Sequence, residues 1–178
     1  MIRVIIKLFL SLCILHAGFI YACGDNSNTL VQGPFRDSAF DNGYICFQKT
    51  SDNRDIEFFL QYMTKQGVYN ALVDTYYYSD APVELMSVFF APVKDERNVI
   101  VLIRWNVNYE EKGIKYPYYY EIKTYNKNKE GLYKLNVYQD NESEFTGYQS
   151  IKNGKVIQYP LNNAEKIKAF LKEKYKVD

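Results

Sequence analysis

The run from residue 99 to residue 109 constrains the fold more strongly than any other stretch of this sequence. Its first four residues, Val99 to Leu102, are all apolar, as in a strand that is buried on both faces. From Ile103 onward, apolar and polar side chains alternate, which is typical of a strand with one face in solvent. We therefore expect this run to be an inner strand of a sheet.

Two further pairs of runs predict hairpins. Residues 118–125 and 132–138 are rich in aromatic and β-branched side chains and are separated by a polar stretch that contains a glycine. Residues 145–151 and 156–159 are separated by an Asn-Gly pair at 153–154, which suits a two-residue turn with positive φ. The sheet pairing should therefore be largely antiparallel.

Shorter runs predict strands at residues 44–47 and 84–93, whereas residues 56–63 fit either a strand or a helical turn. The chain closes with an amphipathic helix that should cover one face of the sheet, with Asn162 as its expected cap. The fold class predicted is α+β, a mainly antiparallel β-sheet built from meanders and hairpins with a C-terminal helix packed on it. The apolar positions of the helix are Ala164, Ile167, Leu171 and Tyr175.

Residues 1–22 have the pattern of a cleavable secretory signal. Two basic residues precede a short apolar run, no acidic residue occurs, and smaller residues lead up to Ala22. We expect export to the bacterial periplasm, with an irregular lead-in or tether at residues 23–42. Residues 43–178 should then form a single domain.

Cys23 follows the expected cleavage point and leaves two alternatives open. Residues 20–23, Ile-Tyr-Ala-Cys, resemble the lipobox of bacterial lipoproteins, in which the cysteine is lipidated and anchors the protein to the outer membrane. Without lipidation, Cys23 and Cys46 are the only cysteines left after cleavage, and an oxidising compartment would let them form a disulfide. The two alternatives exclude each other.

The composition argues against most enzymes and against nucleic-acid binding. Cleavage of the leader takes away two of the 22 basic residues and none of the 21 acidic ones, so the exported chain has a net charge of about −1. It therefore has no excess of basic residues that could neutralise the phosphates of a nucleic acid. The leader also contains the only histidine, His16, so no imidazole remains for a nucleophile triad or a catalytic zinc site. We expect a protein without enzymatic activity or cofactor, and leave open only a pair of carboxylates brought together by the fold.

Acidic residues near position 140 raise the question of a calcium site. Asp140, Glu142 and Glu144 alternate like the first ligands of a calcium loop, but the next glycine is Gly147, two positions later than an EF-hand turn requires. We therefore expect a solvated turn between strands and leave calcium binding near Asp140 open.

Tyrosine is the most unusual part of the composition, with 18 in the chain and 17 after the leader. Neighbouring side chains of a strand point to opposite faces, so a tyrosine triplet exposes at least one ring if only one face is buried. Exposed tyrosine is typical of protein interfaces, although tyrosine also fits ordinary sheet positions. The candidate partner-binding residues are the two triplets, Tyr76, Tyr77, Tyr78, Tyr118, Tyr119 and Tyr120.

A leader followed by a small β-rich domain without catalytic groups resembles the immunity proteins that bacteria keep in the periplasm. These proteins act against toxins of contact-dependent systems such as type VI secretion. The resemblance rests on this general plan of residues 1–22 and the domain that follows. It implies a tight one-to-one protein-protein complex in which this protein is a toxin inhibitor that covers the active site of a secreted effector enzyme.

Two other functions stay open. One family of lysozyme inhibitors, which are also small exported β proteins, carries Ser-Gly-x-x-Tyr, and Thr146-Gly147-Tyr148 is the nearest feature here. A ligand-binding or envelope-assembly lipoprotein would instead use the aromatic surface to line a pocket.

Overall fold

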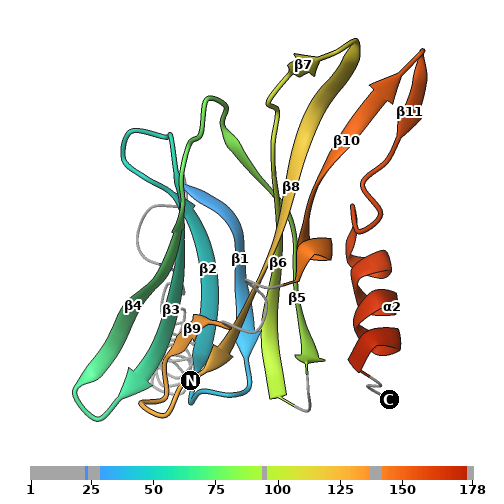
Figure 1. Ribbon diagram of the computed structural model, residues 1–178. Helices are drawn as coiled ribbons and strands as arrows, with labels where there is room; N and C mark the ends of the chain where they lie inside the picture. The colour runs from blue at the N-terminus through green and yellow to red at the C-terminus, as the bar shows by residue number, and fades with distance from the viewer. Residues whose placement is uncertain (1–22, 24–28, 94–95, 137–141, 176–178) are drawn as a thin grey trace, which may run out of the picture.

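Two antiparallel sheets and a helix lie beside one another as three layers (Figure 1). The computed structural model describes residues 23, 29–93, 96–136 and 142–175. The predicted leader at residues 1–22 therefore lies outside the described residues.

Sheet A, the first layer, contains four strands in sequence order. Each strand pairs antiparallel with the next. Residues 56–63, for which a strand and a helical turn were both open, belong to the third of these strands. The strands are β1 (Leu30–Asp37), β2 (Gly43–Lys49), β3 (Ile56–Thr64) and β4 (Gly67–Tyr76).

The prediction of an irregular lead-in at residues 23–42 is wrong for the part that forms β1. Gly33 and Pro34 interrupt the side-chain alternation of this segment, and the pairing of β1 with β2 shifts register once across them and once before them, between Leu30 and Gln32. Gly33 has φ of +107°, and a Cβ atom there would lie 2.9 Å from the carbonyl oxygen of Ile45. The strand is therefore real but irregular, with a glycine that its close approach to β2 requires.

Sheet B, the middle layer, is organised around the long strand β8. β6 and β7 pair along one edge of β8, and β9 and β10 pair along the other edge. The pairing confirms both predicted hairpins, since β8 pairs with β9 and β10 pairs with β11. The strands are β5 (Val83–Val93), β6 (Glu96–Trp105), β7 (Tyr109–Glu111), β8 (Ile114–Lys127), β9 (Tyr133–Leu135), β10 (Thr146–Lys152) and β11 (Lys155–Ile157).

β6 is buried on both faces, as its sequence predicted. Val99, Val101 and Ile103 lie in the core between the two sheets. Ile100 and Leu102 lie in a second core between sheet B and the helix. Side-chain alternation in this one strand therefore links all three layers.

The third layer is the helix α2 (Ala164–Tyr175), which packs on the outer face of sheet B through the buried side chains of Ile167 and Leu171. Its N-cap is Asn163 and not the predicted Asn162, because the amide of Lys166 donates to Asn163 Oδ1 at 3.0 Å. The mainly antiparallel α+β fold with a packed C-terminal helix is thus confirmed.

Sheet B extends beyond sheet A. Gln32 of β1 donates to the carbonyl oxygen of Leu85 in β5, and the hydroxyl of Tyr125 in β8 contacts Asp74 of β4. The four strands of sheet A therefore lie opposite β5, β6 and β8, and Figure 1 shows the ends of sheet B that carry β7 and the β10–β11 turn projecting past sheet A. In this projecting region, sheet A does not cover the inner face of sheet B.

Candidate functional site

Five aromatic rings form a continuous row on the inner face of this projecting region, and we call them the aromatic strip. Each ring contacts the next, with centroid separations of 5.7, 5.3, 4.9 and 5.8 Å along the row. Aromatic pairs at such separations attract one another beyond the area that they bury. The rings, in order, are Tyr109, Tyr116, Tyr148, Tyr119 and Trp105.

Strand register places these rings together. Tyr109 lies directly opposite Tyr116, and Tyr119 lies directly opposite both Tyr148 and Trp105 on its two neighbouring strands. Directly opposite residues of antiparallel strands point to the same face, so four strands contribute to one surface. β6 ends at Trp105 and does not continue to residue 109 as predicted, and the separate strand β7 carries Tyr109 to the far end of the row.

The strip changes from buried to exposed along its length. Trp105 is buried, and its Nε1 donates to the carbonyl oxygen of Tyr77 at 3.0 Å. Tyr116 and Tyr119 are half-buried, whereas Tyr109 and Tyr148 each expose 49% of their surface. The exposed rings are therefore held by neighbours that the fold already fixes, which lowers the entropy that they lose on contact with a partner.

Charged groups lie beside Tyr109 at one end of the strip and beyond Tyr119 on β8. The hydroxyl of Tyr109 donates to Glu111 Oε2 at 3.0 Å, and this hydrogen bond raises the pKa of Tyr109. Beyond Tyr119 on β8, Lys123 and Glu121 form an ion pair at 3.1 Å. An aromatic centre with a polar border is the usual anatomy of a protein interface.

Contrary to the prediction, not all six tyrosines of the two triplets are accessible to a partner. Tyr76 and Tyr120 are buried, so proposing them as partner-binding residues was wrong. Tyr76 lies between the sheets within hydrogen-bond distance of the Tyr125 hydroxyl, 2.9 Å away. Tyr120 points to the helix side and stacks on Tyr159 with centroids 5.2 Å apart. Both rings belong to the cores.

The other four triplet residues lie at or near the surface but do not form one site. Tyr77 is the most exposed, at 67%, and Tyr78 lies beneath the guanidinium of Arg54. Tyr118 faces the helix side, beneath the guanidinium of Arg104. Only Tyr119 joins the aromatic strip, so the prediction missed the strip's other four members.

The structure forms a disulfide between Cys23 and Cys46, with the Cα atoms 5.7 Å apart. The amide of Cys23 also donates to Gln61 Oε1 at 3.2 Å, which fixes this residue on the outer face of sheet A. Of the two alternatives for Cys23, this geometry supports the disulfide, because a sulfur in that bond cannot carry a lipid.

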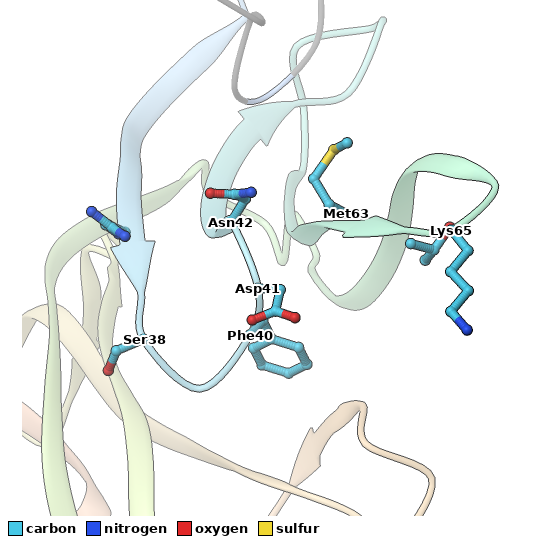
Figure 2. Close-up of a pocket in the computed structure, with 8 residues that line it drawn as sticks. Ser38, Phe40, Asp41, Asn42, Met63 and Lys65 are labelled. Atoms are coloured by element: carbon cyan, nitrogen blue, oxygen red, sulfur yellow. The ribbon is translucent and has the colours of Figure 1, made fainter.

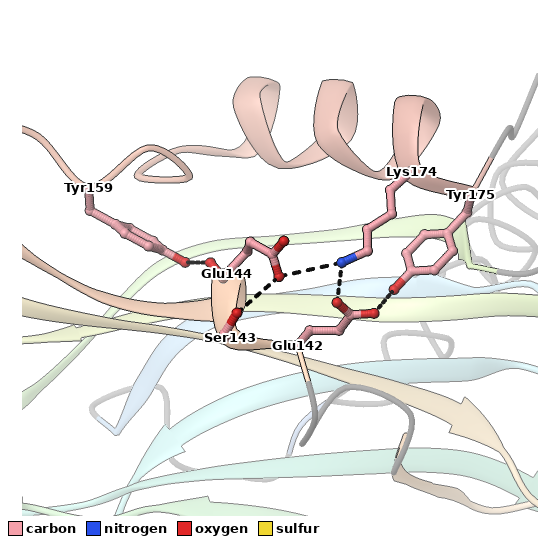
Figure 3. A network of polar contacts seen from close by, with 6 residues as sticks. All are labelled: Glu142, Ser143, Glu144, Tyr159, Lys174 and Tyr175. Atoms are coloured by element: carbon pink, nitrogen blue, oxygen red, sulfur yellow. Dashed lines mark hydrogen bonds and ion pairs between the residues drawn. The ribbon is translucent and has the colours of Figure 1, made fainter.

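Two of the acidic residues near position 140 form ion pairs with a lysine of α2 (Figure 3). Lys174 of α2 forms ion pairs with Glu142 and, at 3.4 Å, with Glu144, and the hydroxyl of Tyr175 donates to Glu142 at 2.8 Å. Asp140 lies outside the described residues, within which no cluster of three or more potential metal-ligating side chains is found. The observed role of Glu142 and Glu144 is to join η2 (Ser143–Phe145) and its flank to α2.

Two surface hollows contain no residue of either tyrosine triplet in their lining. The larger, of about 750 Å³, lies between the β1–β2 turn and the β3–β4 turn and is largely polar (Figure 2). A smaller one, of about 310 Å³, touches the strip only through Tyr109. These two hollows therefore give no support to an aromatic-lined ligand pocket. The larger is lined by Arg36, Ser38, Phe40, Asp41, Asn42, Met63, Thr64 and Lys65.

The buried tyrosines predict a loss of stability in alkali. Burial raises the pKa of Tyr76 and Tyr125 above the ordinary value of 10.0. At pH values below 10.0 both the folded and the unfolded chain keep the protons on these two phenols, so the free energy of unfolding has its full value. Above pH 10.0 the unfolded chain releases protons that the folded chain retains, and the free energy of unfolding falls.

Urea midpoints measured from about pH 8 to about pH 11 should therefore decline, and the decline should be shallower in Tyr125→Phe. Exposed Tyr77→Phe is the matched control and should keep the slope of the unmodified protein. A Tyr125→Phe slope equal to that of the control would contradict the assignment.

The fold and the strip together define a β-rich α+β domain that carries a partly exposed aromatic strip. No family model matches the chain, and no curated protein or solved structure is significantly similar to it. Within the described residues, no helix has the length and apolarity needed to cross a membrane.

Proposed function

We propose that this chain is an exported binding protein of the bacterial periplasm that neutralises a toxic effector enzyme by forming a tight complex with it. The observation that carries the proposal is the aromatic strip, whose partly exposed rings continue from the buried Trp105 to Tyr109 at the free end of sheet B. Such a surface presents large contact areas with few rotatable bonds, which favours tight protein association.

Two features favour a binding role over catalysis. The chain after the leader contains no histidine. The carboxylates of Glu142 and Glu144, which are close to each other, share the ammonium of Lys174. The strip therefore acts by contact with a partner, and an immunity protein needs only to cover its toxin's active site.

Replacing Tyr148 with serine should weaken the complex with the toxin by about 30-fold or more, because Tyr148 is the exposed ring at the centre of the strip. The partner to test is the product of an adjacent gene for a secreted toxin, and the dissociation constant is measured by calorimetry. Tyr69→Ser is the matched control, since Tyr69 is 48% exposed but lies on β4, outside the strip. It should bind within about threefold of the unmodified protein.

A growth assay completes this test. Cells that produce the toxin in the periplasm should survive with the unmodified protein and with Tyr69→Ser, and should lose protection with a Tyr109→Ser and Tyr148→Ser double variant. Lethality in the presence of the unmodified protein would refute the immunity function. Equal protection by the double variant would refute the strip as the contact surface.

A further inference from the structure

Four strands lie at the ends of the two sheet paths, and three of them carry features that prevent pairing with a further strand. β1 contains Pro34 and two register shifts, and β5 contains Pro92 and a bulge. β11 is only three residues long and begins with Lys155. β4 differs, because its ten residues include no proline, lysine or arginine.

The free edge of β4 is regular over most of its length. Its pairing with β3 shifts register only around Val73, so the run from Gly67 to Leu72 is uninterrupted. Within the described residues, β4 pairs with β3 alone, and the backbone groups on its other side have no strand partner. An unguarded edge of this kind is a template for another strand.

Apolar side chains accompany this edge on the outer face of sheet A. Leu72 lies opposite Phe59, which in turn lies opposite Cys46 on the face away from sheet B. Leu72 exposes 54% of its surface and Val68 exposes 46%, with Met63 beside Val68. Solvent-facing apolar residues at a free edge lose contact with water if a strand is added there.

We propose that β4 pairs antiparallel with β4 of a second copy of this chain, about a two-fold axis at Asn70. This register is self-complementary on both faces. Val68 of each copy lies opposite Leu72 of the other on the outer face, and Tyr69 lies opposite the small Ala71 on the inner face. The paired run contains no charged residue, so no like charges meet across the axis.

The geometry of the fold permits this dimer. Asn70 is level with Gln61, Tyr44 and Arg36 across sheet A, close to the end at which β1 stops. A two-fold axis there reverses the strand direction, so the projecting β10–β11 ends of the two copies point away from each other (Figure 1). The five paired residues of each strand form a small interface, so the dimer dissociates on dilution.

The test is sedimentation equilibrium of the disulfide-bonded protein and of charge variants of β4. The unmodified protein should dimerise reversibly, and V68K and L72E should each raise the dissociation constant by about tenfold or more. The double variant V68K/L72E should restore dimerisation, because the proposed register sets each lysine opposite a glutamate of the other copy. Within one strand these positions are about 14 Å apart, too far for direct contact.

V68K/L72K is the matched control, since it changes the same two exposed positions but places like charges opposite each other and should stay monomeric. Circular dichroism verifies that every variant is folded. A monomeric unmodified protein at about 1 mM would overturn the proposal. So would a dimer that all four variants leave unchanged, or a V68K/L72E protein that stays as monomeric as V68K/L72K.

Discussion

Replacing Asp37 with alanine should lower the free energy of unfolding by about 3 kcal/mol or more. The carboxylate of Asp37 is fully buried at the end of β1, where it accepts hydrogen bonds from Tyr133 and from the amide of Ala39 at 3.0 Å. It also forms an ion pair with Arg97 at 2.5 Å. The change would leave the guanidinium, the phenol and the amide without this acceptor, and would loosen the link between sheets A and B.

Urea unfolding followed by circular dichroism measures this effect, with Asp41→Ala as the control. Asp41 lies in the adjacent turn with an exposed side chain, so its removal should change the free energy of unfolding by no more than about 0.5 kcal/mol. Combining Asp37→Asn with Arg97→Met should recover part of the loss, because the uncompensated charge is then gone. Equal effects of Asp37→Ala and Asp41→Ala would show that the ion pair between the buried Asp37 and the partly exposed Arg97 contributes little.

The parts of the fold that could be predicted from sequence are those with strong local periodicity. β6 has apolar residues at consecutive positions because each of its faces meets a separate core, and the Asn153-Gly154 turn has positive φ at both residues, as a two-residue hairpin requires. β1 was missed because Gly33 and Pro34 break its alternation. Its position depends on the shape of β2, which local sequence does not reveal.

The candidate site was harder to predict, because its residues come from four strands. Tyr118, Tyr119 and Tyr120 are consecutive, yet only Tyr119 faces the uncovered side, since the helix covers the face that Tyr118 and Tyr120 share. Which face is covered depends on where α2 packs. The contact of Tyr119 with Tyr148 depends in turn on the register of β8 with β10, so composition identified the right residue type without the right positions.

Reduction of the disulfide between Cys23 and Cys46 should lower the free energy of unfolding by about 3 kcal/mol. The bond closes a loop between positions 23 residues apart in sequence, and opening it restores the entropy of that loop to the unfolded chain. Urea unfolding with and without reductant measures the loss, and in Cys23→Ser the reductant should have no further effect.

Mass spectrometry of the exported protein tests for the same disulfide without a measurement of stability. A Cys23–Cys46 bond lowers the mass by that of the two hydrogen atoms lost on oxidation of the thiols, whereas lipidation of Cys23 raises it by several hundred daltons. Because Cys46 is fully buried and Cys23 covers it on the outer face of β2, a lipidated Cys23 would have to leave Gln61, to which its amide now donates. An acylated mass together with reductant-insensitive unfolding would therefore show that the protein is membrane-anchored and that the first residues of the domain are arranged differently.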